Sequence, residues 1–298
     1  MSGHAPHILC AGLVALDLEM MVVDHPLQGV KHRASDSRMT HGGGALNAAA
    51  AILRLGGQVT LAGAIGADDL GAILCGRIDA LGVGRDLLQV AAGQVTPHSA
   101  VLITPDGERT IINRRDDGLD LLPSVPEPFA FGAALADTRF PLLSATVLAA
   151  ARAAGRPAVL DAEAPIGIAK TALREASHVA FSMQGLVDYA GRADAAALAE
   201  VARDLGTWVC VTRGSDPVLC HDGQGGYEVP VPKVRAVNTN GAGDMWHGAF
   251  ALALACGQDE ATAVADANES AALYVSGMPV QVRTQIQAMR RGPLIKGI

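Results

Sequence analysis

The residues best suited to chemistry lie in the run Val237–Asp244, which reads Val-Asn-Thr-Asn-Gly-Ala-Gly-Asp. Its carboxylate, Asp244, follows three small residues, Gly241, Ala242 and Gly243, and an apolar helical pattern comes after it. The first N–H groups of a helix lack intrahelical partners and carry the positive end of the helix dipole. Glycines let an anion such as a phosphate approach those donors closely. On the local sequence alone, an ordinary helix start is at least as good an explanation.

A second glycine-rich run, Gly42–Asn47, leads into a helical pattern over Ala48–Leu55. Gly43 would let a polyol approach the backbone, and the amide of Asn47 can both donate and accept hydrogen bonds. Neither glycine-rich run continues into the Gly-Lys-Ser/Thr of a phosphate-binding P-loop. The plain alternative is again a turn followed by a helix start.

Two further groups follow apolar strand-like segments. Asp17 either accepts hydrogen bonds from ligand hydroxyls or simply ends a strand, and its position favours neither. The segment Thr212–Ser215 places small polar groups after a strand, which suits nucleotide phosphates but is weak evidence alone.

Composition narrows the class of protein. The chain has 298 residues, half of them hydrophobic, so it can bury a large core. A net charge of −7 with 18% charged residues argues against a nucleic-acid surface. No apolar run reaches the roughly 18 residues of a membrane span, and the first residues do not resemble a signal peptide. The five cysteines and the scattered histidines lack disulfide or metal-ligand spacing, so we predict a soluble cytoplasmic protein without a metal site of its own.

Short β-rich runs alternate with Ala- and Leu-rich helical patterns. The strand-like runs are Ile8–Leu13, Val59–Ala64, Ala158–Asp161, Val179–Ser182 and Trp208–Thr212. The helical patterns are Ala45–Leu55, Asp69–Leu81, Ser144–Ala154, Ala195–Leu205 and Met245–Cys256. This alternation predicts a doubly wound, mostly parallel α/β sheet with helices on both faces, whose ligands bind at the carboxyl ends of the strands. We expect residues 1–298 to form one domain.

Two stretches, roughly residues 13–40 and 96–120, are strand-like but lack a long helix. Within the second, Ser99–Ile103 and Arg109–Asn113 flank a Pro-Asp-Gly turn and predict a hairpin. We expect both stretches to form a small sheet that projects from the main domain. It would serve as a lid that keeps water from a phosphoryl group, although a plain edge sheet fits the sequence as well.

Together these segments resemble the ribokinase/PfkB family of carbohydrate kinases from the first strand to the final helices. Gly42–Ala49 is similar to the family's N-terminal signature, and Asn238–Asp244 to its C-terminal one. The two signatures in this order are far more specific than either alone. The resemblance implies a ribokinase-like α/β fold with a β-sheet lid, ATP as the phosphoryl donor, and Mg²⁺ bound with the nucleotide.

The resemblance also implies roles by matching position. Asp244 would be the base that takes the proton of the acceptor hydroxyl, and the anion hole would be formed by Gly241, Ala242 and Gly243. The family's sugar-hydroxyl binders match Asp17, Gly43 and Asn47. The residues that fall where the family contacts ATP are Thr212, Gly214, Ser215 and Asn268.

The chain departs from the family pattern in two places. Asn238 stands where the family has an acid tied to a monovalent cation, so stimulation by potassium is in doubt. The family's Asn-x-x-Glu, linked to magnesium and phosphate, has no clear counterpart, because Ser182–Gly185 occupies its place. The departures imply altered metal dependence or a weakened enzyme.

Among family members, Gly12–Asp17, Gly107–Asn113 and Leu135–Arg139 resemble ketohexokinase-like and sulfofructose-kinase-like enzymes. The latter hold the anionic end of the substrate with a Lys, an Asn and an Arg, and the nearest residues here are Lys31, Asn113 and Arg139. A planar guanidinium with an ammonium suits a sulfonate or phosphate. For Lys31 a solvated lid position is the slightly better explanation, and for Arg139 the alternatives are balanced.

The resulting hypothesis is an ATP-dependent kinase for a primary hydroxyl of a ketohexose-like sugar, with 6-deoxy-6-sulfofructose as one candidate. Alternatives are a ribokinase, a fructokinase or a nucleoside kinase, although 3% aromatic residues leave few rings for stacking a nucleobase. A sugar-binding regulator that has lost turnover is a further alternative. The family resemblance implies a homodimer through the lid strands.

Overall fold

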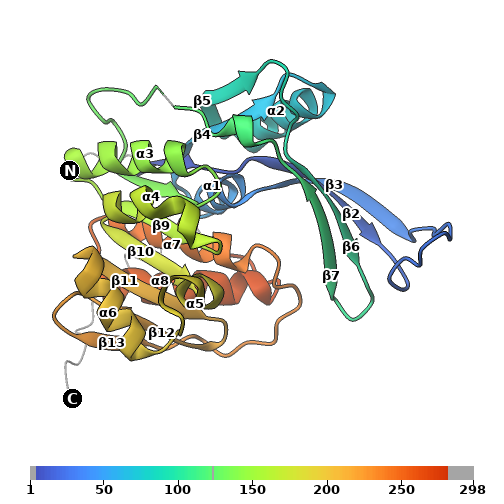
Figure 1. Cartoon of the computed structure of the whole chain (residues 1–298). Helices are drawn as coiled ribbons and strands as arrows, with labels where there is room; N and C mark the ends of the chain where they lie inside the picture. The colour runs from blue at the N-terminus through green and yellow to red at the C-terminus, as the bar shows by residue number, and fades with distance from the viewer. Residues whose placement is uncertain (1–4, 123, 281–298) are drawn as a thin grey trace.

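A large sheet forms the centre of the computed structural model, which describes residues 5–122 and 124–280 (Figure 1). Its nine strands within those residues are β1 (His7–Ala11), β4 (Gln58–Gly66), β5 (Gly84–Ala91), β8 (Ala133–Ala136), β9 (Ala158–Ala162), β10 (His178–Ser182), β11 (Trp208–Arg213), β12 (Asp216–His221) and β13 (Gly226–Val229). They lie in the order β13-β12-β11-β10-β9-β8-β1-β4-β5. The strands from β11 to β5 are parallel, and β12 and β13 add an antiparallel edge.

Helices cover both faces of this sheet, as the alternating pattern predicts. One face carries α1 (Gly44–Arg54), α2 (Asp69–Leu81), α7 (Ala242–Ala255) and α8 (Glu260–Val275). The other carries α3 (Pro141–Ala153), α4 (Lys170–Glu175), α5 (Met183–Ala190) and α6 (Ala195–Leu205). Each face has its own cluster of fully buried apolar side chains, centred on Phe250 on the first face and on Phe140 and Phe181 on the second. The predicted α/β fold class is confirmed.

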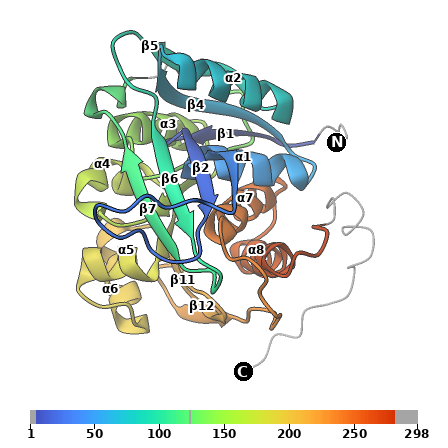
Figure 2. The same cartoon turned by 90° about the vertical axis from the view of Figure 1, so that its right-hand side faces the viewer.

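Four strands form a second, smaller sheet that projects from one end of the large one (Figures 1 and 2). They are β2 (Ala15–Met21), β3 (Asp36–Gly42), β6 (His98–Ile103) and β7 (Arg109–Arg114), in the order β3-β2-β6-β7. β2 pairs with β6 in parallel and the other pairs are antiparallel. The predicted hairpin corresponds to β6 and β7. We call this sheet the lid sheet.

The register of the lid sheet places polar groups in one row. Asp17 is opposite Thr40 on one side and Ser99 on the other, and Ser99 is opposite Asn113. Because side chains opposite one another in a sheet point to the same face, these four side chains share one face of the lid sheet. Three of them, Asp17, Ser99 and Asn113, line the acceptor cavity described below.

In the described part of the chain, no helix is both long and apolar enough to span a lipid bilayer.

Candidate active site

The starts of α1 and α7 meet at the carboxyl ends of the central strands. Gly43 precedes α1 and Gly241 precedes α7, so the two glycine-rich runs of the sequence become two neighbouring helix N-termini. Asn47 Nδ2 donates a hydrogen bond of 2.8 Å to Asp244 Oδ2, across 197 residues of sequence. The predicted sugar-binding amide and the predicted base are therefore in direct contact.

Backbone geometry explains the glycines at both helix starts. Gly43 has φ +86°, and a Cβ there would lie 2.3 Å from the carbonyl oxygen of Leu13. Gly241 has φ +73° and begins α7, accepting from the N–H of Met245 at 2.9 Å. Other residues rarely adopt this left-handed conformation. The first N–H groups of α7 are thereby presented without a side chain at Gly241 or Gly243 in front of them.

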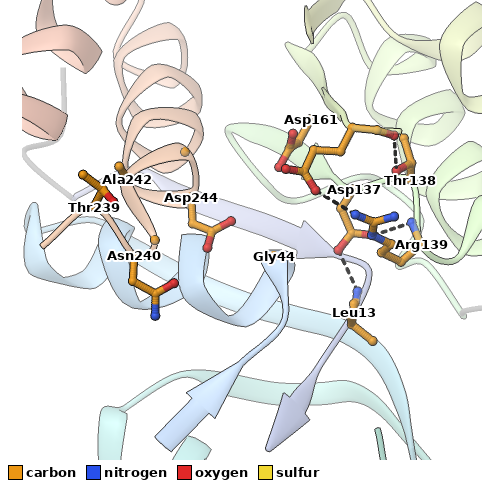
Figure 3. Close-up of a pocket in the computed structure, with 13 residues that line it drawn as sticks. Leu13, Gly44, Asp137, Thr138, Arg139, Asp161, Thr239, Asn240, Ala242 and Asp244 are labelled. Atoms are coloured by element: carbon orange, nitrogen blue, oxygen red, sulfur yellow. Dashed lines mark hydrogen bonds and ion pairs between the residues drawn. The ribbon is translucent and has the colours of Figure 1, made fainter. Parts of the chain in front are cut away.

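A cavity of about 320 Å³ lies in front of these N–H groups, and we call it the transfer cavity. Figure 3 shows Asn240, Ala242 and Asp244 on one side of it and Asp137, Asp161 and Arg139 on the other. It is lined by Leu13, Gly44, Asp137, Thr138, Arg139, Asp161, Glu163 and Thr239–Asp244. The space combines anion-binding backbone with several carboxylates.

Burial raises the pKa of Asp244 to about 7, and the nearby charge of Asp161 adds to that rise. The hydrogen bond from Asn47 acts in the opposite direction, because it favours the charged carboxylate. A carboxylate with a pKa near the working pH suits a general base. Asp244 can accept a proton at neutral pH and also aim a hydroxyl at an anion in the transfer cavity.

Three carboxylates in the transfer cavity were not identified from the sequence. Asp137 accepts from the N–H groups of Leu13 at 2.7 Å and Arg139 at 2.8 Å, and burial raises its pKa although these backbone donors favour the charged form. Asp161 lies at the end of β9 and Glu163 just beyond it. The signal for the last two was present, since Asp-Ala-Glu ends a predicted strand and strand ends form ligand sites in such sheets.

A second cavity of about 290 Å³ lies between the lid sheet and the start of α1, and we call it the acceptor cavity. It is lined by Leu13, Ala15, Asp17, Gly43, Pro97, His98, Ser99, Val101, Ile111, Asn113, Arg114, Arg115 and Arg139. Burial raises the pKa of Asp17, which the hydroxyl of Ser99 partly offsets. Four of the predicted substrate-binding residues, Asp17, Gly43, Asn113 and Arg139, therefore border one space.

A third cavity of about 440 Å³, the nucleotide cavity, opens beside the transfer cavity and shares Thr239, Ala242 and Gly243 with it. Thr212, Gly214 and Ser215 stand at its edge, and most of the remaining wall is apolar, including Val218, Val231, Val234, Ala271 and Val275. An apolar slot that continues into an anion-binding loop suits a flat base joined to phosphates.

A family model described as pfkB family carbohydrate kinase matches residues 5–284 of the chain. The chain belongs to the PfkB family of carbohydrate kinases. It is therefore a phosphotransferase with an alcohol group as acceptor. The family assignment made from the two signatures is confirmed, whereas the narrower resemblance to ketohexokinase-like and sulfofructose-kinase-like members stays a prediction.

Solved structures and curated relatives agree with this assignment. A "putative ribokinase" from Agrobacterium tumefaciens is 30% identical, with a TM-score of 0.88 over 96% of this chain and 98% of that one. The Arabidopsis thaliana ribokinase complexed with ribose and ATP is 22% identical, with a TM-score of 0.79 over 97% of this chain and 100% of that one. The bifunctional protein HldE of Caulobacter sp. is 29% identical over 266 residues, 81% of this chain and 53% of that protein. The chain thus spans about half the length of the HldE proteins it matches.

Two predicted site residues of this PfkB chain have positions unlike those expected. Lys31 lies in the exposed loop between β2 and β3 and does not border the transfer, acceptor or nucleotide cavity. Asn268 borders the nucleotide cavity, but its side chain is buried and already bonded. It accepts from Trp246 Nε1 at 2.7 Å and donates to the carbonyl of Pro230 at 3.0 Å. Asn268 therefore shapes the wall of the cavity.

The lid sheet is hydrogen-bonded to the loop that precedes α7. Arg109 Nη2 on β7 donates to Asn238 Oδ1 at 2.8 Å, and the same oxygen accepts from the N–H of Asn240 at 2.9 Å. Asn238 is the position where the family resemblance leads us to expect an acid. In this chain it joins the lid to the anion-binding turn.

We expect Arg109→Ala to lower kcat/KM for the acceptor by about tenfold, the factor that corresponds to one hydrogen bond of about 1.4 kcal/mol. Amide hydrogen exchange at β6 and β7 should become faster, because the lid sheet would lose its contact with the loop before α7. Arg192→Ala is the control, since the Arg192 guanidinium also donates to side chains, those of Asp194 and Glu200, but lies on the α5–α6 connection. Unchanged exchange in β6 and β7 would contradict the proposed linkage.

No group of three or more His, Cys, Asp or Glu side chains in the described residues is arranged to hold a metal ion. Mg²⁺ in kinases is commonly held by one or two carboxylates together with water and substrate phosphates, so it does not require such a group.

Proposed function

We propose that this PfkB-family chain transfers the γ-phosphoryl group of ATP to a primary hydroxyl of a ketohexose-like sugar. The observation that carries the proposal is the position of Asp244. Its carboxylate borders the transfer cavity, is bonded to Asn47, and has a pKa of about 7. The nucleotide and acceptor cavities flank that position from opposite elements of the fold.

The residues of this chain would divide the work as follows. The base of ATP occupies the nucleotide cavity, and its phosphates lie along Thr239–Gly243, where backbone N–H groups stabilise their charge. Asp244 orients the acceptor hydroxyl and takes its proton. Transition states of phosphoryl transfer are loose, so positioning and charge stabilisation matter more than the strength of the base. Mg²⁺ bound with ATP would neutralise phosphate charge.

Polar groups in the acceptor cavity support a sugar as the acceptor. The carboxylate of Asp17 accepts hydrogen bonds from hydroxyls, and the row that includes Ser99 and Asn113 adds neutral partners. Among the described residues, no Phe, Tyr or Trp lines this cavity, which disfavours a nucleobase as part of the acceptor.

The lining of the acceptor cavity is basic, because Arg114, Arg115 and Arg139 all border it. This charge supports an acceptor with an anionic group, such as the sulfonate of 6-deoxy-6-sulfofructose. Arg139 already has partners, since it donates to Glu163 Oε2 at 2.7 Å and to the carbonyl of Ala164 at 2.8 Å. Arg114 is partnered too, since it pairs with Asp116 and donates to the carbonyl of Arg115 at 2.7 Å. Arg115, whose guanidinium lies 5.9 Å from the centre of the Phe140 ring, therefore carries more of this proposal than the residue singled out in the sequence.

The test is ADP release from ATP and Mg²⁺ with 6-deoxy-6-sulfofructose, fructose, fructose phosphates, ribose and adenosine. We expect the highest kcat/KM with a ketohexose, and a higher value when its far end is anionic. Higher turnover with ribose or adenosine would favour a ribokinase or nucleoside kinase. Sugar binding by thermal shift without turnover on any acceptor would favour a regulator. Because Asn238 replaces the acid linked to a monovalent cation, the same assay with and without KCl should show little stimulation.

We also propose a homodimer through the lid sheet. The face of the lid sheet opposite Asp17 carries Leu18, Met20, Leu102 and Ile112, of which Leu18 and Ile112 are 37% and 65% exposed. Exposed apolar side chains on a sheet face are typical of association sites. Sedimentation equilibrium should show a dimer for the wild type and a monomer for Ile112→Asp. A wild-type monomer at micromolar concentration would rule this out.

A further inference from the structure

The transfer cavity is lined by more acidic than basic side chains at the place where phosphates are expected. Its lining includes four carboxylates, Asp137, Asp161, Glu163 and Asp244, and one cationic side chain, Arg139. A triphosphate entering this space would meet repulsion that the N–H groups of α7 and one guanidinium offset only in part. The cavity therefore has the electrostatic profile of a site that binds phosphate together with a cation.

Asp161 is the least satisfied of these carboxylates. It is 9% exposed, and Oδ1 makes no hydrogen bond to the described residues. Its other oxygen lies 3.4 Å from Nδ1 of His247, which is itself buried and lies near the carbonyls of Gly243 and Ala180 without reaching hydrogen-bond geometry. Buried polar atoms normally have partners, so an unpartnered carboxylate oxygen at the wall of a cavity points to a missing ligand.

Glu163 stands two residues further along the chain, and its side chain is 54% exposed. It pairs with Arg139 at 2.7 Å. Exposed ion pairs of this kind contribute little to stability, so Glu163 can exchange this partner for a stronger one at small cost. Asp161 and Glu163 together offer one fixed and one adjustable carboxylate.

The neighbouring strand lacks the acid that the PfkB pattern provides. β10 ends at Ser182, whose hydroxyl accepts from the N–H of Gly185 at 3.0 Å and caps α5. No carboxylate stands in Ser182–Gly185. β9 runs parallel to β10, with Ala162 opposite Phe181, so the Asp161–Glu163 segment lies beside the place where the acid is missing.

We propose that Asp161 and Glu163 form the carboxylate half of a magnesium–triphosphate site, and that they replace the acid missing from Ser182–Gly185. The buried, unpartnered Oδ1 of Asp161 supports this assignment, because a cation would supply the partner that it lacks. Magnesium commonly takes one or two carboxylates with phosphate oxygens and water, which matches two carboxylates beside the anion-binding turn. This proposal rests on the proposed ATP-dependent function. Bound there, the ion would neutralise charge on the phosphates.

The test measures affinity for the non-hydrolysable analogue AMP-PNP by titration calorimetry, with excess Mg²⁺ and again with EDTA. Glu163→Gln and Asp161→Asn should weaken binding in Mg²⁺ by about tenfold or more, the usual effect of disturbing a metal site. With EDTA, Glu163→Gln should bind AMP-PNP more tightly than the wild type, because it removes a negative charge facing the phosphates. Asp161→Asn should then bind AMP-PNP no more weakly than the wild type. A merely structural role would weaken binding in both conditions.

Two control variants separate the proposed role from simpler ones. Glu228→Gln removes an exposed glutamate, 61% exposed, that also pairs with an arginine, Arg213, and it should leave the magnesium effect unchanged. Arg139→Gln removes the partner of Glu163 and should preserve or enlarge that effect. If Glu163 only holds Arg139 in place, Arg139→Gln and Glu163→Gln would show the same loss.

If Mg²⁺ raises the affinity of Glu163→Gln and Asp161→Asn for AMP-PNP as much as it does for the wild type, the proposed magnesium site is wrong. The proposed kinase function would not be affected by that result. Failure of the wild type to bind AMP-PNP with or without Mg²⁺ would overturn both.

Discussion

Replacing Asp244 with Asn should lower turnover by about 10²- to 10⁴-fold, the usual contribution of a positioned general base. Asn is nearly the same size and can keep the contact with Asn47, so affinity for the nucleotide should hardly change. Steady-state ADP release and calorimetric titration with AMP-PNP measure the two effects separately. Near wild-type turnover would remove Asp244 from the role of base.

The same substitution should stabilise the folded protein at neutral and alkaline pH. An aspartate in the unfolded chain titrates near pH 4, whereas Asp244 in the folded chain titrates at about 7. Between these values the folded state holds a proton that the unfolded state has lost, so the free energy of unfolding falls as the pH rises. The total fall attributable to this group is on the order of 4 kcal/mol.

Since Asn does not ionise, Asp244→Asn should lack this fall. Urea denaturation should give similar stability for the variant and the wild type at pH 4, and greater stability for the variant at pH 8. Asp86→Asn is the control, because Asp86 is an exposed residue of β5. This variant should not become more stable than the wild type at pH 8. Equal stabilities at pH 8 would mean that Asp244 is not held in an environment hostile to its charge.

Catalytic activity should increase as the pH rises, whereas the free energy of unfolding decreases. The carboxylate form is the one that accepts the proton, so kcat/KM of the wild type should rise with pH through about 7 and then level off. Ionisation of Asp244 thus lowers the stability of the folded protein but produces the form that accepts the proton. Such a combination is common at active sites.

Much of the large sheet could be predicted because its signals are local. The runs that became β1, β9, β10 and β11 are short, apolar and bounded by turns, and the helices between them have clear periodicity. β8 is harder to recognise, because the four residues Ala133–Ala136 are as compatible with a buried helix as with a strand. α5 follows β10 without a loop, since Ser182 both ends the strand and caps the helix.

In the candidate site too, the residues that could be predicted are those with a local sequence signal. Asp244, Gly43 and Asn47 could be identified because glycine-rich runs mark them in the sequence. Asp161 and Glu163 have a weaker signal, the end of a predicted strand, and only the fold shows that they share a cavity with the start of α7. The contact between Arg109 and Asn238 is equally invisible, because it joins residues 129 apart through the position of the lid sheet. Only the family resemblance suggests Lys31 as a substrate-binding residue, and the loop that carries Lys31 holds it in solvent.

Asp17→Asn should have the second largest effect, about a 10²-fold loss of kcat/KM for the sugar. The carboxylate of Asp17 borders the acceptor cavity and, in the proposed function, accepts hydrogen bonds from two sugar hydroxyls. Hydrogen bonds to a charged group contribute about 1.5 kcal/mol or more each, so losing the charge against two hydroxyls gives this factor. The KM for ATP should stay close to the wild-type value, because Asp17 does not border the nucleotide cavity.

The matched control is Asp36→Asn, a carboxylate on β3 of the same lid sheet that is exposed and bonded to the N–H of Ser37. It should leave both KM values unchanged, which separates loss of a sugar contact from disturbance of the lid sheet. Direct titration of sugar into each variant gives the ground-state part of the loss. Equal losses for sugar and ATP in Asp17→Asn would indicate that Asp17 maintains the lid sheet, and the sugar would then have to be held mainly by Asn47 and the start of α1.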